Sequence, residues 1–373
     1  MRKLTSLIVA LLMLISAAGC RDGNKSGNAE KVYKLRMTSS LSESGVYSKG
    51  MKAWAEELAK RTNGQVVIDQ MTWSGTIVKA DNNLEGLRDR LVDVAFISVT
   101  NHPNKTPLTN ALIPSFSSDF AGAGAAQEEL WNTVPELKEE WAKYKVVPVA
   151  WFNGYGANLY TNFTVDPDAN SPLAEQKIFA TGAQSPIFVK NLGGIPVSMP
   201  SADIYVSMQK GTIKGIAGIA PFALSTNKFG EITNQVTDYR VTGSTMWTGI
   251  AFNQDAYNEL PDSAKQVIAE IADIPAQVCD RAFNDSTMAG YKIVEQNGGT
   301  LVQLTEEQAA DWQEMIKPEA LWEANIKTAE AAGYKNVREL LAKEIQIMED
   351  YDAQHPHKTL LEQYFELKKE NKI

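Results

Sequence analysis

Apolar residues recur along the chain with two periods, one typical of strands and one typical of helices. Residues 32–40 alternate in part between apolar and polar side chains, which predicts a strand. From Tyr47 to Leu58 the apolar residues return at helical spacing, and Asn63-Gly64 predicts the end of that helix. The next predicted elements are a strand at 65–73, a short amphipathic helix over 84–91 and a buried strand at 92–98. This β-α-β-α-β order predicts a parallel sheet covered by helices.

A second α/β region follows a further predicted strand at 144–152. Its predicted elements are a strand at 176–182, a helix over 200–215 with Ser201 as N-cap, a close-packed strand and turn at 215–222, and a strand at 244–253. From Pro261 the pattern is mainly helical, with helices expected at 261–297, 305–332 and 336–350 and an interruption at 300–304. The whole pattern predicts an α/β protein.

Length and charge limit the possible classes. A chain of 373 residues with 44% hydrophobic content is long enough for two domains. The net charge of −9 is spread along the sequence and repels phosphate backbones, so nucleic acid is not an expected partner.

The N-terminus has the form of an export signal. Arg2 and Lys3 precede an apolar run of about 12 residues, which is too short to span a bilayer. Gly19-Cys20 after small residues resembles the bacterial lipobox, although Ala17 stands where that motif usually has Leu. The resemblance implies a lipoprotein signal peptide at 1–19, lipidation of Cys20 and a flexible tether at 20–30. We therefore expect an exported protein anchored by lipid to a bacterial membrane, facing the periplasm or the cell exterior.

Catalytic and cofactor motifs are scarce. Ser207 and Lys210 fit an SxxK pattern, but its companion motifs are missing and the pair lies in an amphipathic helix. Cys279 falls in a helical pattern and is expected to be a buried apolar residue. His355 and His357 with Asp352 could contact a metal, but a solvated surface explains them as well. We expect no enzyme, no cofactor and no metal site.

The tryptophans divide into two groups. Five lie in helical patterns and are expected to pack in the core or against the surface: Trp54, Trp131, Trp141, Trp312 and Trp322. Trp73, Trp151 and Trp247 lie instead at or near the ends of predicted strands. Ligands of open α/β sheets bind beyond the carboxyl ends of the strands, so these three could face a ligand, or they could simply close the sheet.

Five segments, in this order, resemble the extracytoplasmic solute-binding proteins of TRAP transporters (DctP type). They are MKAWAEELAKRTNGQVVI, LEGLRDRLVDVAFIS, EQKIFATGAQ, GGIPVSMPSADIYVSMQKGTIKG and IAFNQDAYNELPDSAKQVI. The resemblance runs from about Val32 to about Glu349. It implies a two-lobed periplasmic-binding-protein-like fold with hinge strands and a long connecting helix. It also implies that a small molecule is captured between the lobes and delivered to a TRAP-type membrane permease.

The chain pattern and the resemblance together suggest limits for the lobes. The first lobe is expected at 31–153 plus 249–303 and the second at 154–248 plus 304–350, with an exposed C-terminal tail at 351–373.

The chain departs from the family where the ligand is usually held. The family usually carries an arginine that pairs with a ligand carboxylate at the position of Phe179, and a second one at the position of Gly156. A polar residue usually found near Ile216-Ala217-Gly218 is also missing. The ligand is therefore expected to be neutral, aromatic or cationic, not a simple carboxylate. A displaced cation could instead replace the arginine; the candidates are Arg36, Lys79 and Lys190.

The expected ligand-binding residues combine the aromatic positions with polar positions matched to the family. They are Trp73, Trp151, Asn153, Tyr155, Phe179, Trp247, Thr38, Ser98 and Ser201. Two other functions stay open. The same fold could serve as the periplasmic partner of a signalling protein, which neighbouring kinase genes would favour over transport. A periplasmic enzyme would reveal itself by turnover of a small molecule.

Overall fold

Two β-sheets organise the chain, and helices cover both. The computed structural model describes residues 31–113, 115–117, 120–152, 156–181, 185–239, 242–243, 247–356 and 358–373. Residues Tyr33–Ile373 form one unit. Within the described ranges, no helix has both the length and the apolar character needed to cross a bilayer.

The first sheet has five strands in the order β2-β1-β3-β12-β5. Its strands are β1 (Tyr33–Thr38), β2 (Val66–Thr72), β3 (Val94–Ser98), β5 (Val146–Phe152) and β12 (Thr248–Asn253). β1 pairs in parallel with both β2 and β3, which confirms the parallel sheet predicted for the start of the chain. β12 is antiparallel to β3 and to β5, so its first residue lies at the same edge as the last residues of β1, β2 and β3.

Helices bury their apolar stripes on both faces of this sheet. On one face α2 (Val46–Arg61) packs through Met51, Trp54 and Leu58, whose helical spacing places them on one side. The opposite face is covered by α5 (Phe120–Thr133) and α6 (Pro135–Ala142), which contribute Leu130 and Trp141 to a second cluster. The other helices of this region are α3 (Asn83–Arg88), α4 (Pro107–Ala111), α10 (Gln254–Asn258) and α11 (Asp262–Glu270).

The second sheet has six strands in the order β13-β10-β6-β9-β7-β8. Its strands are β6 (Asn158–Thr161), β7 (Lys177–Ala180), β8 (Ile195–Val197), β9 (Gly215–Ile219), β10 (Gln235–Asp238) and β13 (Thr300–Gln303). β7 is parallel to β8 and β9, and β6 is antiparallel to β9 and β10. The helices next to it are α7 (Ser185–Asn191), α8 (Ile204–Gln209) and α9 (Ala223–Thr226).

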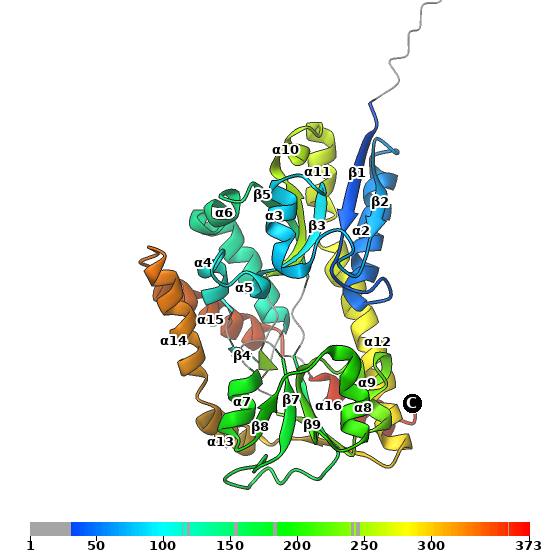
Figure 1. The fold of residues 1–373 in the computed structure, drawn as a ribbon, viewed down its shortest axis with the longest axis vertical. Coiled ribbons are helices and arrows are strands. Elements are labelled where there is room, and N and C mark those ends of the chain that lie inside the picture. The colour runs from blue at the N-terminus through cyan, green and yellow to red at the C-terminus, as the bar shows by residue number, and fades with distance from the viewer. Residues whose placement is uncertain are drawn as a thin grey trace, which may run out of the picture. The chain divides into compact units, whose positions relative to one another are not determined.

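Two chain connections and one long helix link the two sheets. The chain passes from β5 to β6, and returns from β10 to β12 through β11 (Thr242–Gly243), which pairs with β4 (Ser115–Ser117). The helix α12 (Ile274–Gln296) packs against α2 of the first lobe and α9 of the second, as Figure 1 shows in yellow. The chain therefore has the two-lobed fold with hinge strands and a long connecting helix that the resemblance implied.

The C-terminal part packs differently from the predicted lobe limits. β13, expected with the first lobe, pairs with β10 in the second sheet. Of the three helices that begin within 304–350, the range expected in the second lobe, α13 (Glu306–Ile316) packs there, against α7. In contrast, α14 (Pro318–Ala331) and α15 (Val337–Gln354) contact α4 and α5.

The expected exposed tail also contains structure. α16 (Leu360–Lys369) packs on α12, where Leu361 and Tyr364 are buried and the Tyr364 hydroxyl donates to Glu295 at 2.8 Å. Helical periodicity identifies the apolar face of a helix but not the lobe that this face will cover, which explains these differences.

Candidate functional site

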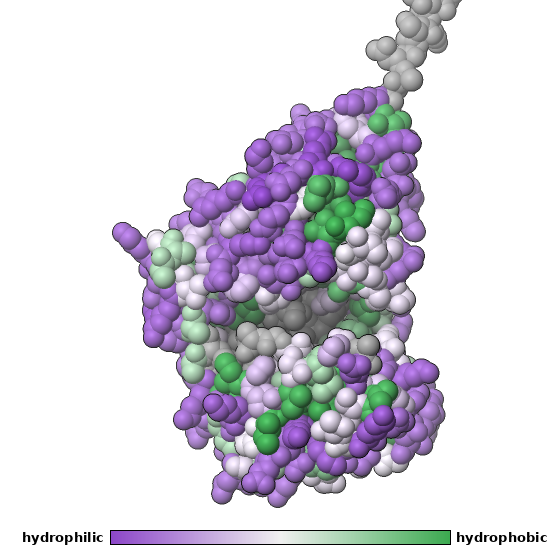
Figure 2. Space-filling model, viewed as in Figure 1, coloured by the Kyte–Doolittle hydropathy of each residue, from purple (hydrophilic) through white to green (hydrophobic). Residues whose placement is uncertain are grey.

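The carboxyl ends of β1, β2 and β3 form one edge of the first sheet, the candidate ligand-side edge. These strands are parallel, so Thr38, Thr72 and Ser98 all stand at carboxyl ends, and the antiparallel β12 places Thr248 beside Ser98. Thr38 pairs with Ala95, so β3 extends three residues further than β1. In the view of Figure 2 the surface is hollowed between the part that carries this sheet and the part that carries the second sheet. Open α/β sheets bind ligands beyond this kind of edge.

Hydroxyl groups dominate the polar contacts of this edge. The Thr72 hydroxyl donates to Thr38 Oγ1 at 3.0 Å and to the Met37 carbonyl at 3.3 Å. Ser98 Oγ lies 3.0 Å from Thr100 Oγ1 and accepts from the Thr248 hydroxyl at 3.2 Å. Thr38 is buried and Ser98 is half-buried. Thr72, Thr100 and Thr248 were not predicted. The available signal was that Thr72 and Thr248 are sequence neighbours of Trp73 and Trp247 and that Thr100 is two residues from Ser98.

Trp73 follows β2 at this edge and is partly buried. Its loop is joined to the loop after β1, because Ser74 N donates to Leu41 O at 2.8 Å and Gly75 N donates to Ser39 O at 3.0 Å. Lys52 Nζ lies 5.3 Å from the centroid of a Trp73 ring and 2.8 Å from Glu43 Oε1. One face of the indole is therefore already next to a cation.

Trp151 and Trp247 belong to a tryptophan cluster under α5 and α6. Their ring centroids lie 5.3 Å apart, and Trp131 and Trp141 lie 5.4 Å and 6.0 Å from Trp151. A Cβ on Gly249 would stand 2.8 Å from Trp151 Cε3, so the absence of a side chain at Gly249 leaves room for this ring on the sheet.

Trp247 is 0% exposed, and its indole N–H donates to the Leu112 carbonyl at 2.8 Å. In this conformation it supports the ligand-side edge from inside and presents no surface to a solute.

Phe179 of β7 is also a buried residue. It is 4% exposed and belongs to an apolar cluster with Tyr160, Ile204, Met208 and Ile216. The residue expected at the arginine position of the family is thus a ring packed into the second lobe.

Of the other predicted polar residues, the structure describes Ser201 but not Asn153. Ser201 begins the 3₁₀ turn Ser201–Asp203, is exposed, and does not cap α8; Asp203 is the residue before that helix. The predicted N-cap role is therefore wrong, because the chain makes a 3₁₀ turn before the helix. Asn153 and Tyr155 lie outside the described residues, as do Cys20 and His357.

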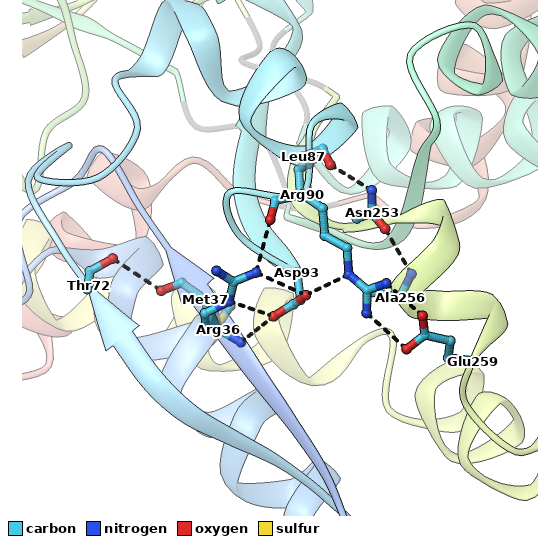
Figure 3. Close-up of polar contacts among 9 residues, drawn as sticks. All are labelled: Arg36, Met37, Thr72, Leu87, Arg90, Asp93, Asn253, Ala256 and Glu259. Carbon is cyan, nitrogen blue, oxygen red and sulfur yellow. Dashed lines mark hydrogen bonds and ion pairs between the residues drawn. The ribbon is translucent and has the colours of Figure 1, made fainter.

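Arg36, a candidate for the displaced cation, is engaged at the amino end of β3. Arg36 Nε lies 3.1 Å from Asp93 Oδ2, and Arg90 bridges Asp93 and Glu259 with Nε–Oδ1 and Nη1–Oε1 distances of 3.3 and 2.6 Å (Figure 3). Burial alone would raise the pKa of Asp93, but hydrogen bonds from Arg36 and Arg90 bring that pKa below its usual value. Lys79 precedes a 3₁₀ turn, and Lys190 lies in the last turn of α7.

The remaining chemical candidates lie in structural surroundings. Cys279 is buried in α12, where burial raises the pKa of its thiol to about 12. Ser207 lies within α8 and Lys210 follows its last residue. The His355 ring stacks on Tyr351 with centroids 4.3 Å apart. The ranges that the structure describes contain no group of three side chains able to hold a metal ion.

Comparison with known proteins identifies the family. The model of the bacterial extracellular solute-binding proteins, family 7 (DctP), matches residues 37–325, so the chain belongs to this family. A solute-binding protein of Albidiferax ferrireducens is 20% identical over 280 residues, which cover 72% of this chain and 79% of that protein.

Solved structures share the fold. A TRAP periplasmic solute-binding protein from Desulfovibrio salexigens matches with a TM-score of 0.72 and 21% identity, covering 88% of this chain and 98% of that chain. An extracytoplasmic solute receptor from Bordetella pertussis that binds pyroglutamic acid matches with a TM-score of 0.65 and 18% identity, covering 84% and 99%. The protein is thus a TRAP-type solute-binding protein of the DctP family, a family of transport proteins that work outside the cytoplasm.

Proposed function

We propose that this protein captures a small neutral, aromatic or cationic solute between its lobes and delivers it to a TRAP-type permease. The observation that carries the proposed ligand class is Phe179, which is buried among apolar side chains where the family usually has an arginine. A carboxylate that enters a closing site loses its hydration and needs a paired cation or several donors. A phenyl ring supplies neither.

The first sheet supports this ligand class. Its ligand-side edge offers the hydroxyls of Ser98 and Thr248 and the partly buried ring of Trp73. Hydroxyls both donate and accept, so they suit a neutral polar group, and the indole suits a planar or apolar surface. We keep Asn153, Tyr155, Ser201 and Trp151 in the proposed site as positions to be tested.

A displaced cation is the main competing explanation. Arg36 is held by Asp93 at the amino end of β3. This leaves Lys79 and Lys190 from the original candidates, and the structure adds Lys52 beside Trp73. If one of them neutralises a ligand, the protein will bind acids as its pyroglutamate-binding relative does.

A thermal-shift screen tests the ligand class. The purified chain is heated with neutral aromatics, amines, small dicarboxylates, sugar acids, keto acids and pyroglutamic acid. We expect stabilisation by a compound from the first two groups and none by the acids. Tight binding of a small aliphatic dicarboxylate would contradict the proposal. Titration calorimetry of a hit with Trp73→Ala should show weaker binding, with Asp69→Asn as a matched surface control.

We also propose that lipid on Cys20 anchors the protein to the membrane. The support is the charged start, the short apolar run and the small residues before Cys20. Replacing Cys20 with Ser should move the protein from the membrane fraction to the soluble fraction of cells. An unchanged membrane fraction would show that the lipid is not the anchor.

A further inference from the structure

Glu344 is a buried carboxyl group in the middle of α15. It is 0% exposed, on a helix that packs against α5, α14 and α4. Neither of its carboxyl oxygens has a hydrogen-bond partner within the described ranges. A buried polar group without a partner is uncommon in proteins and calls for a physical explanation.

The contacts between α5 and α15 show what surrounds Glu344. Lys343 Nζ lies 2.9 Å from Glu129 Oε1 near one end of the contact, and a Cβ on Gly122 would stand 3.0 Å from Met348 O near the other. The two helices therefore run antiparallel, and Glu344 lies opposite the middle of α5. The buried side chains of that stretch are Ala123, Ala126, Gln127 and Leu130.

Gln127 is the polar residue among these buried side chains of α5. Its Oε1 accepts the backbone N–H of Trp247 at 3.4 Å, while its buried Nε2 has no acceptor in the part of the chain that the structure describes. A neutral carboxylic acid can accept from such an amide through its carbonyl oxygen and donate through its hydroxyl. The interface is thus suited to the protonated form of Glu344.

The charged groups of α5 and of α15 itself do not neutralise Glu344. On α5, Glu128 and Glu129 are exposed, and Glu129 pairs with Lys343. On α15, Asp352 lies two turns further, beside Gly122.

The other two helices that pack against α15 are α14 and α4. The charged groups of α14 pair with other residues or are exposed, and α4 has none. On α14, Glu323 and Glu330 pair with Arg338 at 2.8 and 3.0 Å, Lys327 lies 3.4 Å from Glu323, and Glu319 is exposed. The residues of α4 include no titratable side chain. Burial is the cause that raises the pKa of Glu344 well above its usual value.

We propose that Glu344 is a proton-binding site that controls the docking of α15 on the first lobe. While Glu344 is neutral, α15 packs on α5; when Glu344 ionises, its unpaired charge weakens that packing. Because the folded protein holds this proton more tightly than the unfolded chain, the stabilising effect is complete below the unfolded pKa and is lost as the pH rises through the folded pKa. This property lies in a segment beyond residues 37–325, which the family model matches, and it is independent of the proposed ligand.

Thermal unfolding between pH 5 and 9 tests this site. We expect the Tm of the wild-type protein to fall with rising pH, and Glu344→Gln to remove most of that fall and to raise Tm at pH 9 by at least ~2 °C. Glu129→Gln, a surface change on the facing helix, should keep the wild-type slope. Parallel curves for wild type and Glu344→Gln would overturn the proposal.

A direct titration covers the case in which Glu344→Gln does not fold. Carbon-13 NMR of the wild-type protein with labelled glutamate should show one carboxyl that titrates well above the usual range near ~4.3. The tryptophan fluorescence of the protein, to which Trp131 of α5 contributes, should change over the same pH interval. If every glutamate of the folded protein titrates near its ordinary pKa, Glu344 is not the proposed site.

Discussion

The two edges of the first sheet are built from different chemistry. The edge at the amino end of β3 carries a charged network of Arg36, Arg90, Asp93 and Glu259, in which the Asp93 carboxylate is buried (Figure 3). The edge at its carboxyl end carries hydroxyls that bond one another and, beneath them, the buried indole of Trp247. The ion-pair network thus lies at the end of β3 away from the residues that we propose to contact a solute.

This difference has a physical basis. A buried carboxylate is stable only when donors surround it, as the two arginines surround Asp93. Hydroxyls at the other edge satisfy one another without charge and can exchange these bonds for bonds to a ligand. We therefore expect changes at the charged edge to alter stability alone, and changes of surface hydroxyls at the other edge to alter affinity.

The largest effect is expected for Trp247→Ala. The change removes a fully buried ring from the tryptophan cluster and leaves the Leu112 carbonyl without its donor. The free energy of unfolding should therefore fall by about 3–5 kcal/mol. Chemical denaturation followed by circular dichroism measures it. Trp73→Ala, at the same edge but partly exposed, should cost clearly less; equal costs would mean that Trp247 is not a core residue.

Asp93→Asn should have the next largest effect. The neutral amide cannot form ion pairs with the two guanidinium groups. The free energy of unfolding at pH 7 should therefore fall by about 1–3 kcal/mol. Both arginines are partly exposed and can rehydrate, which keeps the loss below that of a fully enclosed pair. Asp69→Asn, which removes an exposed ion pair with Lys34, should leave stability nearly unchanged.

The effect of Asp93 should vanish in acid. Because its pKa is lowered on folding, its stabilising effect is present above the unfolded pKa of about 3.9 and is lost as the pH falls through the lower folded value. The Tm difference between wild type and Asp93→Asn should therefore shrink from pH 7 to pH 3. This pH dependence is opposite to that expected for Glu344. A Tm difference that grows in acid would contradict the prediction for Asp93.

The smallest effect on stability is expected for Ser98→Ala. Loss of the hydroxyl removes bonds to Thr100 and Thr248 and a proposed ligand contact. Affinity for the ligand found by screening should fall by about 0.5–1.5 kcal/mol, or up to about tenfold. Calorimetry measures this, and Asp93→Asn serves as the control that should keep its affinity. The contrast between the edges fails if both variants lose affinity equally.

Part of the candidate site followed from the strand pattern and part from the resemblance to the family. The end of a predicted strand gave Trp73, and the resemblance to the family gave Thr38 and Ser98; in the structure these residues lie at or directly after the carboxyl ends of β2, β1 and β3. The direction of each aromatic side chain did not follow, because it depends on which face the helices cover. Trp151 and Trp247 turn toward α5 and α6, and Phe179 turns into the core of the second lobe.

The local pattern by itself determined the alternation of strands and helices, the parallel start of the first sheet and the α/β class, because periodicity reflects which side of each element is buried. The order of five segments added the family. Only the tertiary structure decided that α14 and α15 cover the first lobe, that α16 docks on α12, and that Glu344 is buried against α5 with no hydrogen-bond partner among the described residues. These contacts join residues far apart in the chain. The apolar stripe of a helix shows that one side is buried, but it does not specify which surface of the protein that side will contact.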